Sequence, residues 1–229
     1  MSDNYGPKIV TDGLLMYVDA ANSKSYPGSG STWFDLSGNS NDGTNYNLDY
    51  SSDNNGSLVY NASGDRTVIS GNITSGMSSI SMCAWFKMTG GSGYRCVIHK
   101  GTTASVGSSQ YWTGFQTSGN VVSTIGAREL DASYLSGDTL VPGVLGTWYN
   151  TTSTWDGSSV NVYLDGVWKV QYNLANLTHI DYPTRLGACS DTGGYQVIGN
   201  IAASLIYGDK VLSSNEVKQN YAALKGRFE

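Results

Sequence analysis

The sequence predicts an all-β protein: a two-layer antiparallel sandwich with one short helix at the C-terminal end. Apolar residues alternate with polar ones in short runs, and clusters of Gly, Ser and Asn separate these runs. No helical periodicity stands between consecutive runs, which argues against alternating strand and helix units. Sandwiches of 200 to 250 residues commonly form one domain, so we expect a single domain over residues 1–229.

A central strand is predicted over residues 79–88. Ile80, Met82 and Phe86 fall on one face, and Trp85 falls on the other. Apolar side chains on both faces are typical of a strand that is covered on both sides. Trp85, Trp148 and Trp155 all lie within strand patterns, so we assign them to the core.

Two Asp-Gly pairs, at Asp156 and Asp165, divide residues 147–170 into three strands. Asp-Gly favours tight hairpins because glycine readily adopts the positive φ that they require. This segment therefore predicts a β-meander. The other predicted strands are residues 14–19, 58–60, 67–70, 94–100, 111–117, 121–125, 184–188 and 196–207.

The helix is predicted to begin after Ser213. Glu216 stands where a capping box needs it, three residues after the N-cap, and Gly226 is the expected C-terminal stop. The apolar stripe of the helix consists of Val217, Tyr221 and Leu224. Because about twelve residues are too few for an isolated helix, it must dock on the sandwich.

Composition limits the partners. Lys and Arg number 13 against 18 Asp and Glu, a formal net charge of −5. Without a basic excess to displace phosphate counterions, nucleic acid is not an expected partner. No window reaches the 18 to 20 or so apolar residues of a membrane span, so no membrane association is expected. The N-terminal residues lack the pattern of a secretory signal, and we expect synthesis in a cytoplasm.

Several motifs, in their order, resemble a known family. They are residues 13–22, 25–28 and 33–39, Asn41 and Gly43, residues 84–86, the meander with residues 163–166, residues 199–202, Ile206 and Tyr207, Asn220 and Tyr221, and residues 225–228. Together they resemble the concanavalin A-like, laminin G-like jelly-roll domains of tailed-bacteriophage structural proteins. The resemblance covers essentially the whole chain. It implies two antiparallel sheets of six or seven strands, one of them curved, with adjacent chain ends.

The resemblance also implies a function, although a fold alone does not name one. The first expectation is a non-enzymatic virion protein, a head-decoration or tail-associated module that contacts other virion proteins and forms a homo-oligomer. The alternative is a lectin-like host-adhesion module that binds surface glycans. In both cases the protein acts by surface complementarity.

No catalytic residues are predicted. Some relatives of the fold hydrolyse β-glucans with a Glu-x-Asp-x-x-Glu strand motif, and a retaining mechanism needs two close carboxyl groups. Glu129 and Asp131 begin that motif, but Tyr134 replaces its last carboxylate. His99 and His179 stand in no nucleophile frame, and phosphate loops and zinc-type Cys/His spacing are absent from the sequence.

The loop from Asp35 to Asp42 has calcium-like oxygen spacing but lacks the Gly and Glu of an EF-hand. Two interpretations stay open: Asx side chains that stabilise a turn, or a structural calcium ion. Cys83, Cys96 and Cys189 form an odd, sparse set, which predicts buried small hydrophobic residues rather than disulfides.

An exposed contact patch is predicted from the aromatic residues, which include 16 Tyr. Tyr111, Trp112, Tyr134 and Tyr195 lie in or beside Gly/Ser-rich segments. An aromatic face with a polar rim suits sugar stacking and protein interfaces alike. Packing in the core or across strands is the alternative for these four residues.

Overall fold

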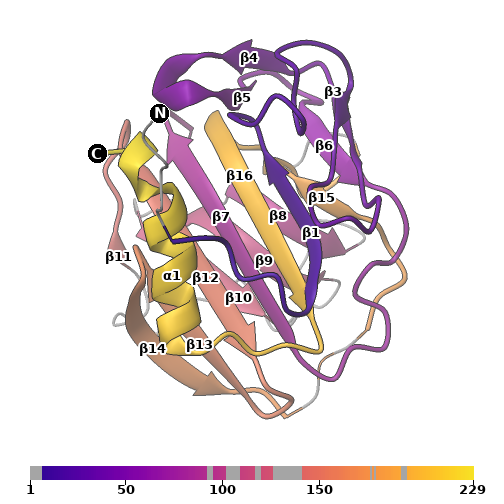
Figure 1. Cartoon of the computed structure of the whole chain (residues 1–229), viewed down its shortest axis with the longest axis vertical. Coiled ribbons are helices and arrows are strands. Elements are labelled where there is room, and N and C mark those ends of the chain that lie inside the picture. The colour runs from indigo at the N-terminus through magenta and orange to yellow at the C-terminus, as the bar shows by residue number, and fades with distance from the viewer. Residues whose placement is uncertain are drawn as a thin grey trace.

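Two antiparallel β-sheets pack face to face, and one helix lies on the outer face of one of them (Figure 1). This arrangement is that of a computed structural model, which describes residues 7–91, 95–101, 109–116, 120–125, 141–175, 177, 179–191 and 195–229. The predicted fold class, an all-β sandwich with a short C-terminal helix, is confirmed.

The first sheet, called sheet A, lies beside the helix. Its order is β14-β13-β12-β7-β16-β5-β4, and β1 also pairs with β16. The predicted central strand is confirmed, because β7 pairs with β12 and β16 and is buried along almost its whole length. The strands are β1 (Leu14–Asp19), β4 (Asp49–Ser51), β5 (Ser57–Tyr60), β7 (Ile80–Met88), β12 (Trp148–Trp155), β13 (Ser159–Leu164), β14 (Val167–Asn173) and β16 (Gly199–Gly208).

The second sheet, called sheet B, has the order β11-β10-β9-β8-β15-β6-β3-β2. Its strands are β2 (Thr32–Trp33), β3 (Gly43–Tyr46), β6 (Arg66–Ile69), β8 (Arg95–Gly101), β9 (Ser109–Gln116), β10 (Asn120–Ile125), β11 (Val141–Pro142) and β15 (Thr184–Leu186). Among the described residues each sheet therefore has eight strands rather than six or seven. The additional strands β2, β3, β4 and β11 have only two to four residues, too few to show alternation in the sequence.

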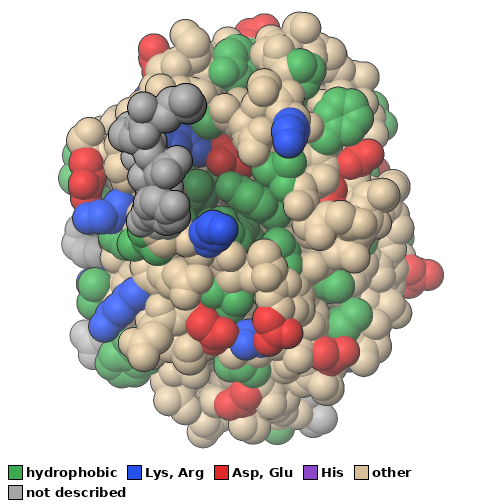
Figure 2. Space-filling model, viewed as in Figure 1, with side chains coloured by type: hydrophobic (Ala, Val, Ile, Leu, Met, Phe, Trp, Pro, Cys, Tyr) green, Lys and Arg blue, Asp and Glu red, His purple; other side chains and the backbone are tan. Residues whose placement is uncertain are grey.

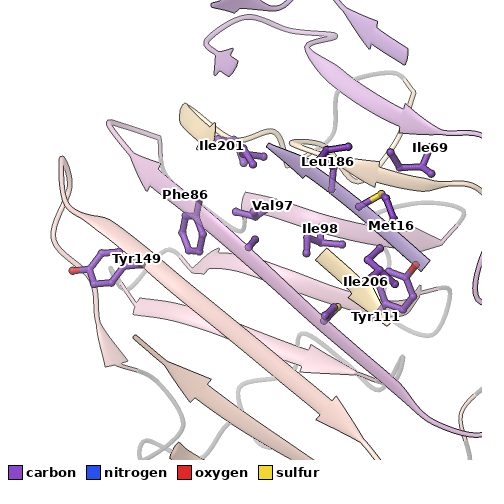
Figure 3. Close-up of a cluster of buried hydrophobic side chains, with 14 of the residues drawn as sticks. Met16, Ile69, Phe86, Val97, Ile98, Tyr111, Tyr149, Leu186, Ile201 and Ile206 are labelled. Atoms are coloured by element: carbon purple, nitrogen blue, oxygen red, sulfur yellow. The ribbon is translucent and has the colours of Figure 1, made fainter. Parts of the chain in front are cut away.

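The main core fills the space between the sheets (Figure 3). Met16, Phe86 and Ile206 enter it from sheet A, while Ile98 and Leu186 enter it from sheet B. All five are essentially inaccessible to solvent. Burial of apolar surface from both sheets supplies the main driving force for folding.

The β-meander is confirmed as β12, β13 and β14, joined by short turns. Asp165 and Gly166 both have positive φ, 52° and 73°, as the two central residues of a tight hairpin require. At the other turn the Asp156 carboxylate accepts hydrogen bonds from the backbone N–H groups of Ser158 and Ser159. Burial is also confirmed for Trp85 and Trp155, whereas Trp148 is only half-buried.

The predicted helix is present as α1 (Ser214–Leu224), with a complete capping box between Ser213 and Glu216. Its buried Val217 packs against the outer face of sheet A. The predicted stop at Gly226 is wrong, because the chain continues into a 3₁₀ helix, η2 (Lys225–Arg227). No helix in the described ranges has the length and apolar character needed to cross a bilayer.

The residues after α1 bind the C-terminal end to sheet A. The Arg227 guanidinium lies 2.7 Å from the carboxylate of Asp19 at the end of β1, and both side chains are largely buried. The same guanidinium donates to the carbonyls of Asn54, in the 3₁₀ helix η1 (Asp53–Asn55), and Gly56. The Phe228 ring stacks on Trp85 at 4.2 Å between centroids. We call Asp19, Trp85, Arg227 and Phe228 the C-terminal clamp.

The interpretation of Cys96 and Cys189 as unpaired cysteines is wrong. They form a disulfide between β8 and the loop after β15, across 93 residues. Their Cα atoms are 5.7 Å apart, within the usual range for such a bond. Cys83 alone is a free, buried thiol as predicted. Sequence spacing could not reveal the pair, because the pairing depends on how sheet B brings distant strands together.

The surface on the helix side carries no large field of one charge. Acidic and basic side chains are interspersed there, with hydrophobic side chains exposed between them (Figure 2). Lys210, for example, forms ion pairs with both Asp12 and Glu216.

Candidate functional site

The predicted contact patch does not form as a unit. The predicted exposure of Tyr111 and Trp112 is wrong, because they are 0% and 4% exposed. As neighbours on β9 they point to opposite faces of sheet B, and both faces are covered there: the Tyr111 hydroxyl bonds Thr184, and the Trp112 indole lies against the Cys96 sulfur. Tyr134 lies outside the described residues. Tyr195 is 42% exposed, as predicted.

The Asx-rich loop uses its oxygens internally. The Asp35 carboxylate accepts hydrogen bonds from the backbone N–H groups of Tyr17, Ser37 and Asn41. Asn39 and Asn41 donate their side-chain amides to the carbonyl of Leu15. These bonds fit the turn interpretation, while a calcium ion at this loop stays a prediction. No group of three or more possible metal ligands occurs in the described part of the chain.

The most distinctive polar group on sheet B is formed by Tyr46, Arg66, Arg185 and Asp191, which we call the Asp191 cluster. Arg185 holds both carboxylate oxygens of Asp191, through Nε at 2.9 Å and Nη2 at 3.0 Å. Arg66 Nε lies 3.4 Å from Asp191 Oδ1. The Arg66 guanidinium also lies 3.9 Å above the Tyr46 ring, which stands opposite it on β3.

Exposure differs sharply within the cluster. The side chains of Arg185 and Arg66 are 3% and 16% exposed, whereas Asp191 is 59% exposed. Tyr46 is 39% exposed. The cluster thus presents an oriented carboxylate and an aromatic ring to solvent, and the two guanidinium groups beneath them are largely buried.

The loop that carries Asp191 is fixed at both ends. At its start, Cys189 is bonded to Cys96. At its end, the Tyr195 carbonyl accepts from the Cys96 N–H at 2.8 Å, and Val197 N–H donates to the Gly187 carbonyl at 2.9 Å. This anchoring holds Asp191 and the exposed Tyr195 on the same short loop.

Charge keeps Asp191 ionised. The hydrogen bonds from Arg185, followed by the charges of Arg185 and Arg66, lower the pKa of its carboxyl below the usual range. An ionised carboxylate accepts strong hydrogen bonds from hydroxyl groups, and an aromatic ring packs on apolar C–H surface. The cluster contains one carboxylate, whereas the two-carboxylate route to glycoside hydrolysis needs two. Its chemistry therefore suits binding.

The burial of His99, next to the Asp191 cluster, predicts that the folded protein loses stability in acid. Burial, together with the charge of Arg185, lowers the pKa of His99 to about 3. As pH falls below about 6.5, His99 binds a proton in the unfolded chain but stays neutral in the folded protein. Stability is therefore lost. We expect the free energy of unfolding to fall by about 1.4 kcal/mol per pH unit between pH 6 and pH 5 from this group. Urea titrations of wild-type and His99→Gln at each pH measure this, and equal slopes would contradict it.

Within the described residues, the other catalytic candidates do not come together in one centre. Glu129 and Asp131 lie outside the described residues. His179 is exposed, and its Nδ1 lies 3.3 Å from the Gln110 side-chain amide. His99 is buried next to Arg185 and stays neutral over most of the pH range.

Comparison with known families agrees with the fold. Residues 61–218 match the family model described as Laminin_G_3, concanavalin A-like lectin/glucanases superfamily. No curated protein shows significant sequence similarity to the chain.

Solved structures share the fold at low identity. The sialidase of Trypanosoma rangeli in complex with 2,3-difluorosialic acid is 13% identical, with a TM-score of 0.69 over 96% of this chain and 34% of the sialidase. The chain thus spans about a third of the sialidase's length. Domain 4 of AbnA, an extracellular GH43 arabinanase of Geobacillus stearothermophilus, in complex with arabinotriose, is 16% identical, with a TM-score of 0.65 over 91% of this chain and 98% of that domain.

A third similar structure is the binding domain of botulinum neurotoxin DC in complex with rat synaptotagmin II. It is 15% identical, with a TM-score of 0.63 over 94% of this chain and 52% of that one. At these identities the likeness establishes the fold alone.

Proposed function

The chain belongs to the concanavalin A-like lectin/glucanase superfamily, and from that membership we propose that it is a non-catalytic binding module for an oligosaccharide, held at the Asp191 cluster. The observation that carries the proposal is the exposed Asp191 carboxylate, oriented by Arg185 beside the exposed Tyr46 ring. The arabinotriose complex of the AbnA domain supports the ligand class, because that domain has this fold over almost its whole length.

The proposal gives each residue of the cluster a role. Sugar hydroxyls donate to Asp191, and the apolar face of a sugar ring packs against Tyr46. Arg185 lies beneath and contributes by fixing the carboxylate, because its own side chain is almost completely buried. Tyr195, on the same loop, extends the contact surface.

Calorimetric titration with a panel of neutral oligosaccharides that includes arabinotriose tests the proposal. We expect Asp191→Asn to weaken binding at least about tenfold, since a hydrogen bond to a charged group contributes roughly 1.5 to 3 kcal/mol. Tyr46→Ala should weaken it by a similar factor, because it removes the aromatic surface on which the sugar ring packs. Asp53→Asn and Tyr50→Ala, at exposed positions on sheet A's side, serve as matched controls and should bind normally. If no oligosaccharide binds the wild-type protein, the proposal fails.

A virion role is the second candidate function. It is favoured by the order of the motifs, which resembles that of phage structural proteins. Two of these motifs also meet in the fold, where Asp19 and Arg227 form the buried ion pair of the C-terminal clamp. Such a clamp suits a rigid module that braces a particle as part of a homo-oligomer, next to other virion proteins. Mass spectrometry of purified particles tests this role, and absence of the chain from every particle protein would end it. The two functions are compatible in one host-adhesion protein.

A further inference from the structure

One end of the sandwich buries a lysine against a side-chain amide. Lys100, near the end of β8, is completely buried. Its Nζ donates to Asn72 Oδ1, in direct contact, and to Thr74 Oγ1 at 2.6 Å. Asn72 and Thr74 belong to the connection between β6 and β7. In sheet B, β6 is separated from β8 by β15.

The same amide is held from its other side by a carboxylate. Asn72 Nδ2 donates to Asp181 Oδ1 at 3.0 Å. Asp181 lies in the segment that leads into β15, the strand between β8 and β6. Hydrogen bonds thus link an amine, a carboxamide and a carboxylate, with the carboxamide in the middle. These are the nucleophile, the electrophile and the proton carrier that transfer of an acyl group from one nitrogen to another requires.

Burial makes the amine a better nucleophile. Desolvation lowers the pKa of Lys100 to about 8, although the Asp181 charge opposes that shift. Roughly a tenth of this amine is therefore uncharged at pH 7, against far less than a hundredth for an ordinary surface lysine. The neighbouring Tyr111 ring, with its centroid 6.0 Å from Nζ, adds an apolar wall to the site.

We propose that Lys100 and Asn72 form an intramolecular isopeptide bond, with Asp181 as the proton carrier. Lys100 Nζ adds to Cγ of Asn72, and Asp181 accepts the proton that Nζ loses. Asp181 then returns this proton to Nδ2 as the Cγ–Nδ2 bond breaks, and ammonia leaves. One C–N bond forms and one breaks, so the step needs neither oxidant, reductant nor co-substrate.

The bond would tie β8 to the β6–β7 connection across a sequence separation of 28 residues. The same strand is already tied to the loop after β15 by the Cys96–Cys189 disulfide. Sheet B would then be cross-linked covalently near both ends of β8. The inference concerns the body of the sandwich and does not depend on whether the Asp191 cluster binds a sugar.

Intact-mass spectrometry of the purified, reduced full chain tests the proposal. We expect a mass below that of the sequence by one ammonia, and a branched tryptic peptide that joins Asn72 to Lys100 and is uncleaved at Lys100. Asn72→Ala and Lys100→Arg should show no ammonia loss, and Asp181→Asn should lose the cross-link while keeping the circular dichroism spectrum of the wild type. Lys24→Arg, at an exposed lysine, is the matched control and should keep the full mass deficit.

Two results would overturn the proposal. One is a mass equal to that calculated from the sequence, with no ammonia lost, in wild-type protein that is folded by circular dichroism. The other is loss of ammonia confined to a linear peptide, since a succinimide at Asn72 would cause that without involving Lys100. A complete cross-link in Asp181→Asn would overturn the role assigned to Asp181.

Discussion

Replacing Arg227 with alanine should lower the free energy of unfolding by about 3 to 5 kcal/mol, the usual effect of removing one partner of a buried ion pair. The Asp19 carboxylate is only 8% exposed and would be left in the protein interior without its cation. The carbonyls of Asn54 and Gly56 would also lose their donor. Guanidinium titration of wild-type and Arg227→Ala measures the difference, and a change below about 1 kcal/mol, the effect of a surface pair, would contradict it.

Lys225→Ala is the matched control for Arg227. It removes a cation two residues away whose pair with Glu229 is solvent-exposed, so we expect less than about 1 kcal/mol. Asp19→Asn and the Asp19→Asn/Arg227→Ala double variant complete the cycle. Because the two side chains are in contact, the double variant should lose less stability than the sum of the single variants.

The Cys96→Ser/Cys189→Ser variant should be destabilised by roughly 4 kcal/mol. A cross-link across 93 residues restricts the unfolded chain strongly, and the chain-entropy estimate for such a loop is roughly 4 to 5 kcal/mol. Urea titrations with and without dithiothreitol measure the effect. The wild-type protein under reducing conditions should behave like the double variant.

Cys83→Ala separates the disulfide from the remaining thiol. Cys83 is buried beneath the helix layer and belongs to no disulfide, so this variant should keep its sensitivity to dithiothreitol. Equal unfolding midpoints for oxidised and reduced wild-type protein would show that the bond adds no stability.

Long strands with a regular pattern were predictable from the sequence. The segment 79–88 and the two Asp-Gly turns carry their signal locally, in alternation and in the residues that tolerate positive φ. Helix α1 was predictable for the same reason, because its capping box lies within four residues. Its end was not, since the ion pair between Arg227 and Asp19 joins residues 208 apart in the sequence.

The candidate site was much harder to predict. Tyr111 and Trp112 have the composition of a contact patch, but both faces of sheet B are covered at β9, and burial of this kind depends on how segments distant in the sequence pack. The Asp191 cluster combines Tyr46, Arg66 and Arg185 from β3, β6 and β15, which lie far apart in the sequence. These residues come together only through the order of the strands in sheet B, and no local sequence motif predicts that order. Of the predicted contact residues that the structure describes, Tyr195 lies in the same connection between β15 and β16 as Asp191.

The contact between residues 8–10 and helix α1 has a practical consequence for engineering. The N-terminal and C-terminal segments lie next to each other (Figure 1), where Val10 N–H donates to the Asn220 side chain and Gln219 donates to the Lys8 carbonyl. A domain whose entry and exit points are neighbours can be inserted into a surface loop of a host protein without forcing that loop apart. The sandwich is therefore suited to being carried as a cassette, displayed from a larger protein with both of its connections on one side.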